Sequence, residues 1–280
     1  MFYDIYMEKL NFKATKDDKL ISILQSKGFS FTNITKILKN KDVKVNDIRT
    51  KTNTDIFIGD EITVFFTEEM REKQNFEIIY QDENILILNK PKGIEVEGED
   101  SLTSILKVLP VHRLDRNTTG LIIFAKNKDS QEELSKAFKN HTINKKYLTQ
   151  VVGETNFKDY TMNAFLLKDS KNSIVKIFKN QIKGSVPITT IFNTLKSSST
   201  SSIVECNLIT GKTHQIRASL AYLNHPIIGD GKYGKNEDNK KFKASTQLLH
   251  CFYLQFGGLK NNLSYLNNKE FTNFPIWFHK

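Results

Sequence analysis

The segment "VHRLDRNTTG", residues 111–120, places one carboxylate between two guanidinium groups. Asp115 lies between Arg113 and Arg116, and an apolar run, "LIIFA", follows the Thr-Thr-Gly turn. A carboxylate among arginines is expected to stay ionised at neutral pH. That charge suits a nucleophile or a general base and suits a general acid poorly. The structural alternative is an Asp–Arg ion pair with Arg113 or Arg116, worth only about 0–1 kcal/mol when exposed.

Arginine is scarce in this chain. Of the 41 basic side chains among 280 residues, five are arginines: Arg49, Arg71, Arg113, Arg116 and Arg217. Because Arg offers a planar bidentate fork that Lys cannot replace, these positions are expected to need that geometry. The net charge of +10 favours a polyanionic partner over a small neutral ligand, although a lysine-rich proteome would give the same excess.

A second segment with a candidate arginine is "LITGKTHQIRASLAYLNHPIIGDGKYG", residues 208–234. Its apolar spacing predicts a helix at about 213–223 after a strand. His214 and Arg217 are three residues apart, so they share one face near the start of this helix. A guanidinium at the edge of the core needs a carboxylate, and Asp115 is the expected partner.

Two shorter segments add candidates. In "LNKPKGIEV" (88–96) the sequence Lys-Pro-Lys-Gly, which begins at Lys90, predicts a turn between two strands. In "NKKYLTQVVG" (144–153) Tyr147 stands where a strand begins. Taken alone, each has an ordinary structural interpretation, a turn in the first case and a core tyrosine in the second.

Two regions are expected to carry these residues. Residues 1–66 show two stretches of helical periodicity and two strands, with the folded core placed at 18–66. The polar segment 67–75 is predicted to be a linker. Residues 76–280 contain many short strands and few helices, which predicts an α+β domain on a mixed sheet rather than a doubly wound fold.

Two local predictions concern helix and loop boundaries in the larger region. A helix is expected at about 130–139, where Ser130 and Glu133 have the spacing of a capping box. The polar stretch "GKNEDNKKFKAS" is predicted to be an exposed, mobile loop.

The cysteines and the distribution of apolar residues indicate the cellular compartment of the protein. Cys206 and Cys251 sit in apolar surroundings without CxxC spacing, which indicates buried thiols in a reducing compartment rather than a disulfide or a zinc site. The charged start of the chain does not resemble a secretion signal, and no apolar stretch approaches the ~20 residues of a membrane span. A cytoplasmic protein without a membrane partner is expected.

Together, the four segments quoted above resemble the RluA-type pseudouridine synthases, a family that isomerises selected uridines in ribosomal or transfer RNA. The resemblance covers residues 76–280 and includes "NILILNKPKGIEV", "HRLDRNTTGLIIFAK", "KKYLTQVVG" and "TGKTHQIRASLAYLNHPIIGDGKYG". It implies a mixed, largely antiparallel sheet flanked by helices with a central RNA-binding cleft.

The resemblance also implies residue roles. Asp115 matches the catalytic aspartate, Tyr147 the tyrosine that packs against the target base, and Arg217 the arginine that pairs with the catalytic carboxylate. Arg113 falls where the family has the arginine that enters the RNA stack as the uridine flips out. The other candidates for substrate binding are Arg116, His214, Lys90 and Lys212. Lys212 stands where Arg is more frequent, which puts a bidentate phosphate contact there in doubt.

The implied reaction breaks the bond from ribose to the base nitrogen, turns the base, and re-forms the bond through carbon. Asp115 would either attack the sugar or abstract a ribose proton, and the sequence does not choose between these routes. No step needs a metal, a redox cofactor or ATP, so no cofactor is expected. Two alternatives from other classes are a catalytically silent RNA-binding or ribosome-assembly protein, and a nucleoside or glycoside hydrolase that uses Asp115.

The N-terminal region resembles the small RNA-binding domain named after ribosomal protein S-four, through "KILKNKDVKVND" and "IGDEITVFF". The usual Arg-Ser near the second helix is absent, and an uncharacterised accessory fold is the alternative. The RNA-binding candidates here are Lys36, Lys39, Lys41, Lys44, Arg49 and Lys51. An RNA-binding module joined to a catalytic domain favours a large structured substrate, so large-subunit ribosomal RNA is preferred over transfer RNA. The protein is expected to act as a monomer.

Overall fold

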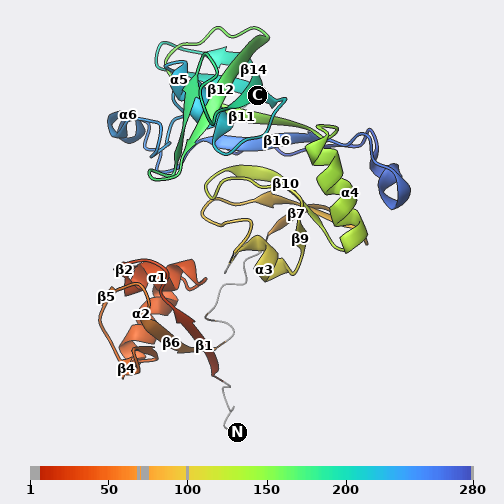
Figure 1. The fold of residues 1–280 in the computed structure, drawn as a ribbon. Coiled ribbons are helices and arrows are strands. Elements are labelled where there is room, and N and C mark those ends of the chain that lie inside the picture. The colour runs from red at the N-terminus through yellow and green to blue at the C-terminus, as the bar shows by residue number, and fades with distance from the viewer. Residues whose placement is uncertain (1–6, 68–69, 71–75, 99–100, 279–280) are drawn as a thin grey trace. The chain divides into compact units, whose positions relative to one another are not determined.

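The computed structural model describes residues 7–67, 70, 76–98 and 101–278. The chain divides into two compact units, Met1–Asn75 and Phe76–Lys280 (Figure 1). Most of the linker predicted at 67–75 lies outside the described residues. Each unit has a hydrophobic core of its own.

The first unit packs two helices against a four-stranded antiparallel sheet of order β1-β6-β3-β4. Its elements are β1 (Glu8–Lys13), β2 (Asp18–Lys19), α1 (Leu20–Ser26), α2 (Phe31–Asn40), β3 (Val43–Val45), β4 (Ile48–Arg49), β5 (Asp55–Ile56) and β6 (Glu61–Phe66). Strand β1 lies outside the core predicted at 18–66, yet it pairs with β6 along its whole length. The folded part therefore begins earlier than the sequence pattern indicated.

The second unit is built on one sheet of eleven strands, whose main order is β13-β12-β14-β15-β11-β16-β10-β8-β7. The strands are β7 (Glu77–Gln81), β8 (Ile85–Lys90), β9 (Leu109–Pro110), β10 (Thr119–Ala125), β11 (Asn144–Val152), β12 (Tyr160–Asp169), β13 (Ile174–Phe178), β14 (Val186–Ser197), β15 (Ser201–Leu208), β16 (Leu249–Gln255) and β17 (Glu270–Thr272). Their pairings are antiparallel, apart from the parallel pairing of β10 with β16. This confirms the α+β class and the mixed, largely antiparallel sheet.

The parallel pairing joins the two halves of the sheet. It consists of two register pairs, Thr119 with His250 and Gly120 with Cys251. The backbone of Gly120 has φ +104°, and a Cβ there would lie 2.3 Å from the carbonyl oxygen of Cys251. Glycine is therefore required where β10 enters the junction. The segment that carries Asp115 leads directly into this point.

The helices of the second unit are α3 (Leu102–Leu106), α4 (Lys128–Lys139), α5 (Gln215–Tyr222), α6 (Asn236–Lys241) and a 3₁₀ helix, η2 (Asn261–Leu266). In Figure 1, α4 lies beside the β9–β10 half of the sheet and α5 beside the β12–β14 half. The described residues contain no helix of the length and hydropathy that crossing a membrane requires.

Two local predictions were wrong. The N-cap of α4 is Asn127, whose side chain accepts a hydrogen bond from the backbone of Ser130 at 2.9 Å, so Ser130 lies inside the helix and forms no capping box. The stretch predicted to be a mobile loop contains the exposed helix α6. In the first case the Asn127 side chain caps the helix three residues before Ser130. In the second, the polar composition of the stretch did not distinguish a short helix from a loop.

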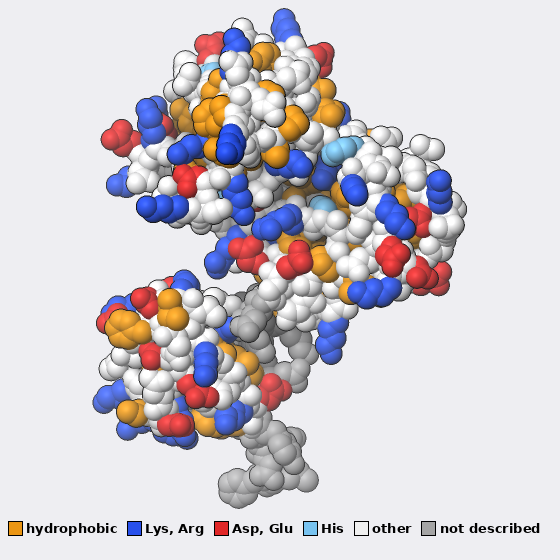
Figure 2. Space-filling model, viewed as in Figure 1, with side chains coloured by type: hydrophobic (Ala, Val, Ile, Leu, Met, Phe, Trp, Pro, Cys, Tyr) orange, Lys and Arg blue, Asp and Glu red, His pale blue; other side chains and the backbone are white. Residues whose placement is uncertain are grey.

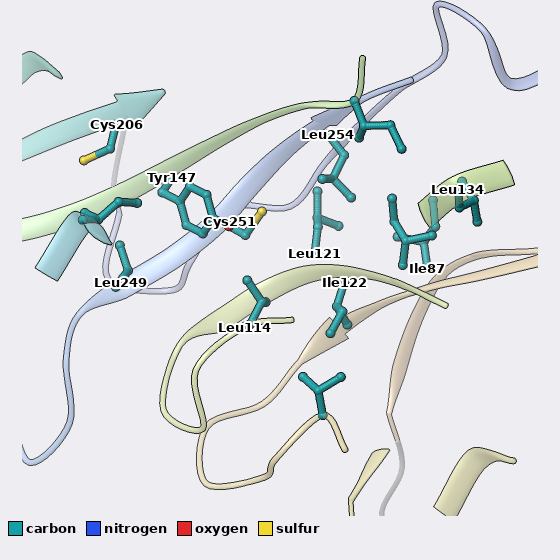
Figure 3. Packing of buried hydrophobic residues seen from close by; sticks show 14 of the residues in the cluster. Ile87, Leu114, Leu121, Ile122, Leu134, Tyr147, Cys206, Leu249, Cys251 and Leu254 are labelled. Atoms are coloured by element: carbon teal, nitrogen blue, oxygen red, sulfur yellow. The ribbon is translucent and has the colours of Figure 1, made fainter. Parts of the chain in front are cut away.

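The main core runs through the junction between the sheet halves. Figure 3 shows the ring of Tyr147 beside Cys251, with Leu114 and Leu121 close by. Both cysteines, Cys206 and Cys251, are buried and unbonded to each other, as the sequence predicted. The catalytic candidates on this part of the chain are therefore supported by closely packed apolar side chains.

Candidate active site

The loop 111–118 that carries Asp115 is held by backbone contacts on both sides. The amide of Thr118 donates to the carbonyl of Asp115 at 3.0 Å, which closes a turn immediately before β10. The amide of Gly93 donates to the carbonyl of Arg116 at 3.0 Å, and the Arg116 Nε donates to the carbonyl of Gly93 at 3.1 Å. The Lys-Pro-Lys-Gly turn after β8 therefore clamps the loop after Asp115.

Lys90 completes this clamp and corrects one prediction. Its side chain is fully buried, and Nζ donates to the carbonyl oxygens of Pro91, Arg116 and Thr118 at 3.0, 2.8 and 3.1 Å. Burial lowers the pKa of Lys90 to about 8. With all three bonds made inside the protein and no exposed surface, Lys90 presents no surface that a substrate could touch. It positions the loop that carries Asp115.

Asp115 pairs with Arg217, as the sequence predicted, and not with either flanking arginine. The Nη1 of Arg217 donates to Oδ2 of Asp115 at 2.9 Å. The carboxylate is largely but not fully covered, since 18% of the Asp115 side chain is exposed against 6% for Arg217. One face of the carboxylate thus remains accessible from solvent.

The sequence interpretation missed a second carboxylate. Nε and Nη2 of Arg217 donate to the two oxygens of Asp230 at 2.7 and 2.9 Å, and Asp230 is fully buried. Arg217 therefore binds Asp230 through two parallel hydrogen bonds and uses its remaining nitrogen, Nη1, to bind Asp115. The only sequence signal was an aspartate between two glycines in "IIGDGKYG".

The Asp230 turn is itself fixed by neighbouring backbone. Its carboxylate accepts from the amides of Lys232 and Tyr233 at 2.8 and 3.1 Å. The side chain of Asn239 on α6 accepts from the Gly229 amide at 2.7 Å and donates to the Asp230 carbonyl at 3.2 Å. The segment predicted to be a mobile loop thus holds the partner of Arg217.

Burial and charge act in opposite directions on this pair. Burial alone would lower the pKa of Arg217, but the hydrogen bonds and charges of Asp230 and Asp115 raise it above its ordinary value. Burial alone would raise the pKa of Asp230, but Arg217 and two backbone amides lower it. Both groups are therefore charged at neutral pH, and breaking one side would leave a buried charge without its partner.

A pocket of about 280 Å³ opens over Asp115 and Arg217. Tyr147 forms part of its wall, and burial raises the pKa of its hydroxyl well above the usual value, so the phenol stays protonated. Figure 2 shows Lys and Arg side chains, together with histidines, gathered around a hollow in the second unit. The pocket combines a carboxylate, an aromatic ring and a positive rim.

The other substrate-binding candidates divide into two groups. Arg113, Lys212 and His214 line the pocket. Within the described part of the chain, no hydrogen bond or ion pair holds the exposed guanidinium of Arg113. Arg116 is exposed beside Gly93 and does not line the pocket, so no contact with a bound base is expected from it.

Further pocket residues were not among the sequence candidates. His112 and Lys145 line the wall toward α4, where the Lys145 Nζ lies 4.8 Å from the ring centroid of Phe138. Burial lowers the pKa of both Lys145 and His112. Lys145 stands in the same quoted segment as Tyr147, but a lysine in a lysine-rich chain gave no signal of its own.

The basic candidates of the first unit are not equivalent. Lys36, Lys39, Lys41 and Lys51 are exposed. Arg49 donates to the carbonyl of Lys41 at 2.7 Å and lies over the ring of Phe65 at 5.3 Å, and the Nζ of Lys44 is 3.6 Å from a carboxylate oxygen of Asp47. Arg49 and Lys44 thus have structural partners already.

Comparison with known proteins identifies the class. A family model described as RNA pseudouridylate synthase matches residues 84–222, which include Asp115, Tyr147 and Arg217. Ribosomal large subunit pseudouridine synthase C of Vibrio cholerae is 31% identical over 266 residues, covering 83% of this chain and 82% of its own. An uncharacterized RNA pseudouridine synthase of Bacillus subtilis is 30% identical over 268 residues, covering 87% and 86%.

Solved structures agree on the fold. The human protein called "RNA Pseudouridylate Synthase Domain Containing 4" aligns with a TM-score of 0.59 at 23% identity. The alignment covers 72% of this chain and 90% of that protein chain. The human protein called "RNA Pseudouridylate Synthase Domain Containing 1" gives the same TM-score, and that alignment covers 68% of this chain and 84% of the other. The family model and the relatives in sequence thus define an enzyme that rearranges uridine within RNA. This chain belongs to the RNA pseudouridine synthase family, whose members are isomerases that convert uridine to pseudouridine.

Proposed function

We propose that this enzyme modifies large-subunit ribosomal RNA in the cytoplasm, as a monomer, and that Asp115 carries its catalysis. The central observation is the Asp115 carboxylate, held at 2.9 Å by Arg217 on the floor of a pocket that Tyr147 borders. The ribosomal substrate is supported by the relatives named for the large subunit, one of which shares 31% of its residues with this chain.

The reaction requires the target uridine to leave the RNA stack, at a cost of a few kcal/mol. Arg113 stands exposed at the pocket and has no partner among the described residues, so its guanidinium is available to fill the vacated space. Stacking of a guanidinium on the neighbouring bases would offset part of the cost.

Inside the pocket, Asp115 acts on the ribose while Tyr147 holds the base. The bond between C1′ and N1 breaks, and the uracil turns against the Tyr147 ring. A bond from C1′ to C5 then forms, C5 loses its proton, and N1 gains one, so the reaction is an isomerisation without net loss of atoms. Asp115 either attacks C1′ or removes a proton from C2′, and Arg217 stabilises its carboxylate in both routes.

The first unit is proposed to bind RNA through its own basic side chains. Its exposed lysines, Lys36, Lys39, Lys41 and Lys51, offer the charge that contacts phosphates. With two binding regions, a large folded RNA is favoured over a single small stem-loop.

Pseudouridine mapping of total RNA tests this proposal. A strain without the gene should lack one or more pseudouridines in large-subunit ribosomal RNA, while its transfer RNA is unchanged. The wild-type gene should restore them, and a gene carrying Asp115→Asn should not. Loss confined to transfer RNA would refute the ribosomal substrate, and restoration by Asp115→Asn would refute the catalytic role.

A further inference from the structure

His214 lies at the catalytic carboxylate in an uncommon backbone conformation. It is the N-cap of α5 with φ +55°, in the left-handed region that residues other than glycine rarely adopt. Such conformations persist where the surroundings fix them, and they concentrate at functional sites. Here the ring is held between two groups: Nδ1 is 2.9 Å from the Tyr233 hydroxyl, and Nε2 is 3.7 Å from Oδ2 of Asp115.

The hydrogen bonds favour one ring nitrogen as the carrier of the proton. The Tyr233 hydroxyl accepts from the amide of Val175 at 2.8 Å, so its single proton is free to donate to Nδ1 of His214. Burial lowers the pKa of His214, which favours the neutral ring. In that ring Nδ1 is the acceptor and Nε2 carries the hydrogen. The opposite tautomer would point a bare lone pair at the carboxylate of Asp115.

The Nε2–H group then faces the pocket, and none of the residues that the structure describes places an acceptor at hydrogen-bond distance from it. The 3.7 Å to Asp115 exceeds the range of such a bond. Asp115 must approach either C1′ or C2′ of the target ribose, and the 2′-hydroxyl is attached at C2′. In both routes the 2′-oxygen comes next to the carboxylate, within reach of this donor.

We propose that His214 donates from Nε2 to the 2′-oxygen of the target ribose, and that Tyr233 is a positioning residue that fixes the required tautomer. The proposal rests on the proposed role of Asp115 in bringing the ribose to this place. It makes His214 the residue that distinguishes ribose from deoxyribose at the target nucleotide, because the 2′-hydroxyl is the group that separates RNA from DNA.

A cycle of protein and substrate changes isolates this contact. The full-length protein carrying Asp115→Asn, which is expected not to turn over, is titrated with two RNAs. One is a stem-loop containing the mapped uridine, and the other is the same RNA with 2′-deoxyuridine at that position. Adding His214→Asn, which tolerates the left-handed backbone and overlays only the Nδ1 side of the ring, should weaken binding of the uridine RNA about tenfold, the size of one hydrogen bond. Binding of the 2′-deoxy RNA should change less than twofold.

His214→Gln serves as the matched control, because its amide reaches toward the place of Nε2. It should retain most of the discrimination that His214→Asn loses. Equal losses by His214→Asn on the two RNAs would overturn the contact. That result would leave the proposed function intact, since the wild-type rate and the inactivity of Asp115→Asn are measured separately.

Tyr233→Phe tests the positioning step without touching the histidine. The phenyl ring keeps its place beside the Arg217 guanidinium, whose Cζ is 5.3 Å from the ring centroid, but the hydroxyl is removed. Nitrogen NMR of the labelled imidazole should show hydrogen on Nε2 in the wild type and a mixture of tautomers in Tyr233→Phe, together with a reduced preference for ribose. Hydrogen on Nδ1 in the wild type would overturn the assignment.

Discussion

At the scale of single residues, three charged side chains form the centre of the proposed site, namely Asp115, Arg217 and Asp230, and the sequence revealed the first two. The pairing of Arg217 with Asp115 was predictable because a guanidinium on a buried helix face needs a carboxylate. The bidentate contact with Asp230 was not, because several aspartates could have served and only the folded turn brings this one to the fork. The tautomer of His214 depends on hydrogen bonds with Tyr233 and Val175, and no regular spacing in the sequence predicts that these three residues lie together.

Arg217→Lys should cost far more than its conserved charge suggests. A lysine can contact one of the two carboxylates but cannot bond both oxygens of Asp230 while reaching Asp115. We expect at least a tenfold loss in the single-turnover rate, about 1.4 kcal/mol in the barrier. Thermal unfolding of the same sample checks that the fold survives. A rate within twofold of the wild type would show that Arg217 does not orient Asp115.

Tyr147→Phe should separate packing from hydrogen bonding. The ring remains in the wall of the pocket, so the affinity for RNA should stay within about twofold. The protonated hydroxyl is lost, and turnover should fall at least fivefold, roughly 1 kcal/mol. Rate and affinity are measured on the same RNA. Tyr147→Ala should impair both. Normal turnover by Tyr147→Phe would reduce the role of this residue to packing.

At the scale of secondary structure, periodicity located the buried strands and helices but not the elements held by specific contacts. The runs at β8 and β10 could be recognised as strands because each contains a nearly continuous apolar stretch, and β11 because the part from Tyr147 onward is rich in β-branched and aromatic residues. The N-cap of α4 was predicted at the wrong residue, because Asn127 caps the helix three residues before Ser130. Helix α6 was not predicted, because its residues are polar and carry no apolar periodicity. Lys90 was predicted to bind substrate because the sequence shows that a lysine stands in this turn but does not show that its side chain is buried.

Lys90→Met should loosen the Asp115 loop as a whole. Three carbonyl oxygens would lose their donor, which should lower the free energy of unfolding by roughly 2–5 kcal/mol. Denaturant unfolding measures this loss, and the rate of isomerisation should fall with it because the loop no longer fixes Asp115. An unchanged stability would show that the clamp contributes nothing.

The free energy of unfolding of the same variant should depend on pH differently from that of the wild type. The pKa of Lys90 is about 8 in the folded state against the ordinary 10.5, so the unfolded state holds more protons between these values. Stability contributed by Lys90 therefore rises as the pH increases through this window. The difference between wild type and Lys90→Met should be larger at pH 10 than at pH 7. A difference that shrinks over this range would contradict the assignment.

At the scale of the whole molecule, the family and the fold class followed from the order of four motifs. Three of them contribute residues to one pocket, and the fourth, the Lys-Pro-Lys-Gly turn, holds the loop that carries Asp115. The division of labour between the two units could only be inferred from charge. Four lysines of the first unit are exposed, and the partners of Arg49 and Lys44 emerged only in the structure. Surface charge is a weak sequence signal in a chain with 41 basic residues.

Replacing Lys36, Lys39, Lys41 and Lys51 by glutamine should therefore change how binding of long ribosomal fragments depends on salt. If three of them contact phosphates of looped RNA, the log–log slope should fall by roughly two units, at about 0.7 per contact. The saturated rate on a short stem-loop should persist. Glutamine at Lys19, which pairs with Asp55 at 2.7 Å, is the control. An unchanged slope would show that the first unit does not bind RNA through these lysines.

The assignment of catalysis to Asp115 is tested most directly by a single-turnover assay of Asp115→Asn, using RNA with tritium at C5 of uridine. Asparagine is nearly isosteric and its amide oxygen can still accept from Arg217, so fold and RNA affinity should be close to those of the wild type. Tritium release should be abolished, because a neutral amide can neither attack the sugar nor remove its proton. Release at the wild-type rate would contradict the account.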